Sequence, residues 1–132
     1  MLLNFTVENC LSFMSEQEFT MLRKGQRSTQ NKQDMRSWIS PVAAIYGDNA
    51  AGKSNLLKCM NFFSNFVRSS SVPREGINTQ PFLLDRESAE QPSTFYIEFI
   101  AKDGNRYQYW FSIDAHKVLE EVLWMFRPET NR

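Results

Sequence analysis

Apolar and polar residues alternate along the start of the chain, which is the pattern of a half-buried β-strand. The apolar positions of this alternation are Leu3, Phe5 and Val7. Residues 9–15 are expected to turn the chain, and residues 16–22 to return as a partner strand with Phe19 and Met21 facing inward. The chain is therefore expected to open with a β-hairpin.

The clearest alternation lies further on, in residues 94–101 and 106–114, which flank the strong hairpin-turn dipeptide of Asp103 and Gly104. The inward face is expected to carry Phe95, Ile97, Phe99, Tyr107, Tyr109, Phe111 and Ile113. The opposite face is only partly polar, with Tyr96, Glu98, Ile100, Gln108, Trp110 and Ser112. Residues 118–126 predict a third strand or a short helix, so that residues from about 94 to 126 form an antiparallel sheet.

The spacing of an amphipathic helix runs through residues 55–68. Its apolar positions are Leu56, Leu57, Met60, Phe63, Phe66 and Val67. Ahead of it, the short apolar run of residues 41–46 suits a strand covered on both faces. Residues 82–84 are expected to dock on the core as a short edge segment. Polar connections are expected at residues 23–40, 69–76 and 87–93.

Between the predicted strand and helix, residues 47–54 read G-D-N-A-A-G-K-S and fit G-x-x-x-x-G-K-[ST], the phosphate-binding loop. Glycines allow close approach of an anion, and backbone amides at a helix N-terminus attract it. Lys53 is expected on the β- and γ-phosphates, and the Ser54 hydroxyl on Mg²⁺. The nucleotide-binding residues of this loop are expected to be Gly47, Asn49, Ala50, Ala51, Gly52, Lys53, Ser54 and Asn55.

Composition limits the other possibilities. Lys plus Arg and Asp plus Glu are both 15, so no overall basic field exists to hold nucleic acid or an anionic membrane. No apolar run approaches the ~20 residues that span a bilayer, and the N-terminus lacks a signal-peptide pattern, which favours the cytoplasm. Cys10 and Cys59 fit no metal-binding spacing, so reduced cysteines are expected, with a structural disulfide as the minor alternative.

The residues around the loop resemble a known family. Residues 4–13, N-F-T-V-E-N-C-L-S-F, resemble the opening strand of the ABC-type ATPase heads of SMC-like and RecF-like proteins. Residues 45–57, I-Y-G-D-N-A-A-G-K-S-N-L-L, are similar to the loop of one branch of these, the bacterial ATP-binding proteins often encoded in phage-defence and abortive-infection operons. Leu11 departs from this pattern, since many relatives carry Arg there, as does Ala51, where Ser is usual.

The resemblance implies an α/β fold: a P-loop NTPase forming part of an ABC-type head, with the strand, loop and helix at 41–68 beside an antiparallel β-subdomain. It implies ATP and Mg²⁺ as cofactors and a second copy of the chain joined across nucleotide, with DNA or an operon-encoded effector protein as further partners. Leu11, Ser12 and Phe13 would flank the adenine or ribose, and Asn49 would lie near the γ-phosphate. For these turn residues, a purely structural turn with a core Phe is an equal alternative.

Other elements of ATP hydrolysis are not found in residues 1–132. No apolar run ends in Asp-Glu, and no L-S-G-G-Q-like signature follows. The chain is therefore expected to be the N-terminal lobe of a larger head, with no catalytic residues of its own. The alternative functions are a non-catalytic nucleotide-sensing module that works with a partner, and another P-loop enzyme such as a kinase or GTPase.

Several weaker signals have simpler interpretations. Residues 31–34, N-K-Q-D, match the guanine-selecting tetrapeptide of GTPases, but they lack an apolar strand to position them. His116 lacks neighbouring ligands for a metal, and Glu120 and Glu121 are expected to be solvated. The aromatic residues near Arg106 could stack on bases, although their alternation favours a sheet core. These are Tyr107, Tyr109, Trp110 and Phe111.

Overall fold

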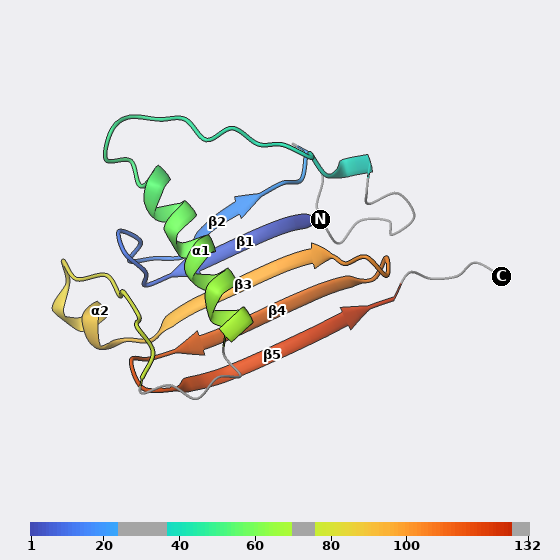
Figure 1. Ribbon diagram of the computed structural model, residues 1–132. Helices are drawn as coiled ribbons and strands as arrows, with labels where there is room; N and C mark the ends of the chain where they lie inside the picture. Colours follow the sequence, from blue (N-terminus) through green and yellow to red (C-terminus); the bar gives the residue numbers. More distant parts are fainter. Residues whose placement is uncertain (24–36, 70–75, 128–132) are drawn as a thin grey trace.

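Five antiparallel strands form one sheet in the order β2-β1-β3-β4-β5. The computed structural model describes residues 1–23, 37–69 and 76–127. The strands are β1 (Leu2–Glu8), β2 (Gln17–Thr20), β3 (Ser93–Ile100), β4 (Arg106–Ile113) and β5 (Val118–Phe126). The first strand therefore lies inside the sheet, between β2 and β3, with both of its edges paired (Figure 1).

Helix α1 (Lys53–Ser69) lies across one face of the sheet, and the short helix α2 (Arg86–Glu90) lies at one end of it (Figure 1). The segment before α1 runs along the β2 side of the sheet and then turns back into the first residue of the helix. The loop that joins β1 to β2 lies near the same end of α1. This arrangement brings the N-terminal hairpin to the start of the helix.

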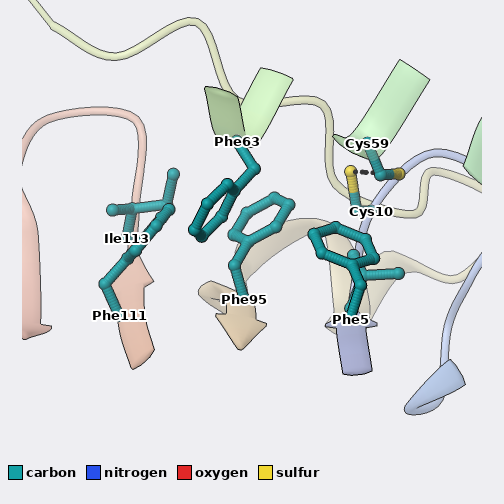
Figure 2. Packing of buried hydrophobic residues seen from close by; sticks show 8 residues of the cluster. Phe5, Cys10, Cys59, Phe63, Phe95, Phe111 and Ile113 are labelled. Atoms are coloured by element: carbon teal, nitrogen blue, oxygen red, sulfur yellow. Dashed lines mark hydrogen bonds between the residues drawn. The ribbon is translucent and has the colours of Figure 1, made fainter. Parts of the chain in front are cut away.

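The main core lies between α1 and the sheet and consists largely of phenylalanine. Phe63 of α1 stacks on Phe111 of β4 with ring centroids 5.4 Å apart, and meets Phe5 of β1 edge to face at 5.9 Å. Figure 2 shows Phe63 directed from the helix toward the side chains of β1, β3 and β4. Because buried aromatic side chains remove large apolar areas from water, these contacts hold the helix on the sheet.

A second, smaller core forms where β1 departs from regular pairing. The register of β1 against β3 shifts between Leu2 and Asn4, and Leu3 packs with Ile39 and Ile100 in a separate cluster. Ile39, only 4% exposed, belongs to the stretch that the sequence pattern assigned to a polar connection. A single apolar residue has no periodicity, so only the tertiary structure shows that it is buried.

The hairpin predictions are confirmed. The residues that the alternation placed on one face pair with one another: Phe95 with Phe111, Ile97 with Tyr109 and Phe99 with Tyr107. Residues 118–126 form a strand rather than a helix, and β2 pairs with β1 through Phe19 and Phe5. The stacking contacts of Tyr109 and Phe111 with α1 support the sheet-core interpretation of these aromatic residues.

The expected strand at residues 41–46 is wrong. The segment is in none of the described strands, and Val42 and Tyr46 are 76% and 92% exposed. A doubly covered parallel strand needs neighbours on both sides, and every strand pair in the described part of the chain is antiparallel. The fold is thus α/β with an antiparallel sheet, and residues 41–46 have no parallel strands among the described residues with which to pair.

Two smaller expectations are also wrong. Leu83 and Leu84 are 74% and 91% exposed, so residues 82–84 do not dock on the core as an edge segment. Residues 86–90, within an expected polar connection, form α2, because the side chain of Asp85 caps that helix by accepting a hydrogen bond from the Ser88 amide.

The predicted helix is confirmed, although two of its apolar positions are exposed. Leu57 and Val67 are 58% and 41% exposed, so the buried stripe is narrower than the sequence pattern suggested. Cys59 is fully buried in the stripe and was not among the predicted core positions. Within the described residues, no helix has the length and apolar character needed to cross a bilayer.

Candidate phosphate-binding site

The loop of residues 47–52 leads directly into α1, which begins at Lys53. A tight turn forms where the Ala51 amide donates to the Asp48 carbonyl at 3.3 Å. Ala50 and Gly52 have φ values of 67° and 88°, in the left-handed region. Ala51 lies between them and is not in that region; left-handed residues that alternate with others in this way can turn successive backbone amides toward a common side, which is how such loops form anion-binding concavities.

The Lys53 side chain folds back over this loop. Its ammonium donates hydrogen bonds to the backbone carbonyls of Gly47, at 2.6 Å, and Asp48, at 2.5 Å. Among the residues that the structure describes, no carboxylate forms an ion pair with Lys53. The positive charge is therefore positioned by neutral groups, so it stays available to an anion bound at the loop.

Gly52 packs against the turn between β1 and β2. A Cβ atom at this position would lie 3.1 Å from Cε1 of Phe13 and 3.5 Å from Oγ of Ser12. Asn55, the third residue of α1, donates from Nδ2 to the Ser12 hydroxyl at 2.9 Å. The structure thus brings Ser12 and Phe13, predicted from the opening strand, to the end of the predicted phosphate loop, where α1 begins.

Asn9 holds that turn in place. Its Nδ2 lies within hydrogen-bonding distance of the carbonyls of Ser88 and Gln91, both at 2.8 Å, and its Oδ1 accepts from the Phe82 amide at 3.0 Å. The residue is 4% exposed and has a φ of 49°, a conformation that asparagine tolerates better than most residues. Asn9 belongs to residues 4–13, the segment that resembles the ABC-type heads, but the sequence did not predict these hydrogen bonds.

Leu11 lies elsewhere. It packs against the main core, and its amide donates to the Gln80 carbonyl at 2.7 Å. The position that carries Arg in many relatives is therefore used here for packing. Three turn residues were expected near the base. Ser12 and Phe13 lie beside Gly52 and Asn55, whereas Leu11 packs on the main core.

The remaining site residues lie on the surface of the loop and the helix. Asn49, Ala50, Ala51 and Ser54 are exposed, and Asn55 is half-buried beside Ser12. An exposed Ser54 hydroxyl at the second position of α1 is accessible to a hydrated Mg²⁺ ion. The exposed amides and the Lys53 ammonium suit a polyphosphate, so the residues present fit ATP with Mg²⁺.

The residues that gave the weaker sequence signals lie away from this loop or outside the described residues. His116 is exposed in a turn, where its amide donates to Asp114 Oδ1 at 2.7 Å. Glu120 and Glu121 are exposed on the edge strand β5, and Glu121 accepts a hydrogen bond from the Tyr109 hydroxyl. No group of three potential metal ligands occurs in the described ranges. Residues 31–34 lie outside them.

The glycine-bounded loop and the amphipathic helix that begins at Lys-Ser are typical of P-loop nucleotide-binding proteins, whereas the strand that precedes the loop in that class is not formed at residues 41–46. The family assignment agrees with this geometry. The chain belongs to the family described as "AAA domain, putative AbiEii toxin, Type IV TA system", whose model matches residues 42–132, more than half of the chain. No curated protein and no solved structure shows a significant match. The chain is therefore a P-loop, ATPase-like nucleotide-binding domain.

Proposed function

We propose that this chain binds Mg-ATP at residues 47–54 and forms the nucleotide-binding lobe of an ABC-type ATPase head. The observation that carries the proposal is the Lys53 ammonium, held over the loop by the carbonyls of Gly47 and Asp48. In this assignment the amides from Asn49 to Ser54 bind the phosphates and Lys53 supplies their counter-charge. Ser54 supplies a ligand to Mg²⁺.

The turn between β1 and β2 forms the second wall of the proposed site. Ser12 is tied to α1 through Asn55, and the Phe13 ring lies against Gly52, so both lie beside the phosphate loop. An aromatic ring and a hydroxyl at this position suit the ribose and base of a nucleotide. The departure at Leu11 removes one charged contact from this wall and leaves the backbone amides unaffected.

Exposed apolar residues support the proposal that this lobe is covered by further structure in the working protein. Val42, Ile45, Tyr46 and Leu57 are between 40% and 92% exposed, and they lie on the approach to the loop and on the helix that follows. We propose that the rest of an ATPase head covers this surface, and that two heads then join across bound nucleotide. Hydrolysis would need a carboxylate and a water-positioning group from that additional structure.

The family description, with its reference to a toxin, supports a role of such a head in a defence operon. In that role ATP binding and head association would control an effector protein or an action on DNA. The charge balance of the chain gives no overall basic field, so we favour a protein effector.

Binding of a fluorescent ATP analogue by the 132-residue chain tests the proposal. Lys53→Ala should weaken triphosphate binding at least about tenfold, because it removes the positively charged ammonium that would contact the phosphates. Lys58→Ala is the matched control, since it removes the same charge one and a half turns further along α1. Equal affinity for the wild type and Lys53→Ala would refute the assignment.

The Ser54→Ala variant tests metal binding separately from phosphate binding. This variant should bind the triphosphate in EDTA as well as the wild type does, but it should gain little when Mg²⁺ is added. An unchanged response to Mg²⁺ would remove Ser54 from the metal site. A preference for GTP over ATP in competition would instead favour the GTPase alternative.

A further inference from the structure

We propose that Cys10 and Cys59 form an oxidation site, at which a small hydroperoxide converts the two thiols into an intramolecular disulfide. The thiols come from different elements: Cys10 follows β1 and Cys59 lies on α1. Their sulfur atoms are 3.1 Å apart and share a hydrogen bond, as Figure 2 shows. Both are free thiols, with Cys59 fully buried and Cys10 4% exposed.

The positions of the two sulfurs favour a bond between them over other products. A disulfide has a sulfur–sulfur bond of about 2.05 Å, so the atoms must approach by about 1 Å. The chain contains only these two cysteines, so an intramolecular disulfide has a single possible connectivity. Burial of the pair also keeps each thiol away from cysteines of other molecules.

The hydrogen bond between the two thiols favours loss of one proton from the pair, which creates a thiolate. The hydrogen bond with Cys10 lowers the pKa of the Cys59 thiol, and the same hydrogen bond, together with burial, raises the pKa of Cys10. Loss of the first proton is thus eased, and the remaining proton lies between two sulfurs in direct contact. The Cys59 sulfur therefore carries the negative charge, and across the 3.1 Å contact it can accept the proton of Cys10 and so make Cys10 nucleophilic.

Access to the pair is through a small cavity. Cys10 lines a cavity of about 20 Å³ together with Leu11, Lys58, Gln80 and other residues. A volume of this order holds about one water-sized molecule. Hydrogen peroxide, with two heavy atoms, is near that limit, whereas glutathione disulfide and protein thiols are far too large to enter.

The reaction balances with peroxide as the only oxidant. The Cys10 sulfur, which lines the cavity, attacks one peroxide oxygen as its proton passes to the Cys59 thiolate; the O–O bond breaks and hydroxide leaves, which gives a sulfenic acid on Cys10. The Cys59 sulfur then attacks the Cys10 sulfur, the S–O bond breaks, and a second hydroxide leaves. The two thiol protons convert both hydroxides to water, so two thiols are oxidised and one peroxide is reduced.

The product would tie the turn between β1 and β2 to α1. Cys10 lies within that turn, and the turn already contacts the start of α1 through Ser12 and Asn55. A covalent link between residues 10 and 59 also restricts the unfolded chain. We therefore expect the oxidised form to unfold at a temperature roughly 10 °C higher than the reduced form.

Peptide mapping of the peroxide-treated, folded chain tests this site. The reduced 132-residue protein is exposed to one equivalent of hydrogen peroxide, blocked with N-ethylmaleimide and digested without reductant. The expected result is that monomeric protein yields the Cys10 peptide linked to the Cys59 peptide. Dithiothreitol should then separate the two peptides. Cys59→Ser should instead stop at a Cys10 sulfenic acid, which dimedone traps when the oxidised chain is unfolded in its presence.

The wild-type measurements decide the proposal even if the serine variant does not fold. Disulfides between chains, sulfinic acid without a cross-link, or two thiols that remain free to react with maleimide after unfolding would each overturn it. An oxidised monomer whose unfolding temperature equals that of the reduced form would show that the bond does not tie the turn to the helix. None of these outcomes depends on nucleotide binding.

Discussion

At the scale of single residues, the candidate site depends on two backbone positions in the left-handed region. Gly52 turns the chain into α1 where a side chain would meet Phe13, and Asn9 supports the neighbouring turn with hydrogen bonds from both side-chain polar atoms. Sequence reasoning assigned Gly52 to close approach of an anion. The structure adds that the absent Cβ also admits the Phe13 ring.

Replacement of Gly52 by alanine should affect both stability and nucleotide binding. The new Cβ would meet Phe13 at 3.1 Å, and the φ of 88° is unfavourable for alanine, so we expect a loss of about 1–3 kcal/mol in unfolding free energy. Because the Phe13 ring must move, affinity for the ATP analogue should also fall. Urea unfolding and fluorescence titration measure the two effects.

Gly104→Ala is the matched control for that variant. Gly104 has a similar φ of 83°, but it lies in the turn between β3 and β4, away from the loop of residues 47–52. It should lose stability while its nucleotide affinity stays at the wild-type value. If both variants keep full affinity, Gly52 and Phe13 do not shape the site.

At the scale of elements, the β3–β4 hairpin carries a buried charge on the face away from α1. Glu98 is 1% exposed; it accepts from Arg106 Nη1 and from Asn4 Nδ2, both at 2.8 Å. The Arg106 guanidinium also lies 4.2 Å from the centre of the Phe126 ring. The alternation pattern assigned Glu98 to a partly polar outer face, and the neighbouring strands β1 and β4 explain why it is buried there.

Loss of the arginine should be more harmful than loss of the whole ion pair. Arg106→Met leaves the Glu98 carboxylate buried without its positive partner, which should cost about 3–5 kcal/mol of unfolding free energy. The double variant Glu98→Gln, Arg106→Met removes both charges and retains an oxygen for Asn4, so it should recover most of that loss. Urea unfolding compares the variants, and equal midpoints for both would contradict this interpretation.

At the scale of the whole molecule, α1 has a covered side and an open side. Its phenylalanines pack on the sheet, while Leu57 and the segment of Val42 and Tyr46 remain exposed. This exposure is the structural basis for proposing that further protein covers the lobe.

The isolated 132-residue chain should therefore associate with itself. Sedimentation velocity should show concentration-dependent oligomers, and Val42→Ser combined with Tyr46→Ser should shift the chain toward monomer, because these side chains are 76% and 92% exposed. The control is Leu84→Ser, since Leu84 is 91% exposed but lies near α2. A monomeric wild type, or equal effects of the two substitutions, would argue against this surface.

The sequence by itself determined the elements whose signals are local. The P-loop motif, the helix after it and the β3–β4 hairpin with its apolar face all depend on residues within about twenty positions of each other, so spacing alone identifies them. Only the tertiary structure decided the rest. The burial of Ile39 and Glu98, the contact of Phe13 with Gly52, and the meeting of Cys10 with Cys59 join positions far apart in the chain. The failed strand at residues 41–46 has the same cause, because a strand exists only where another strand pairs with it.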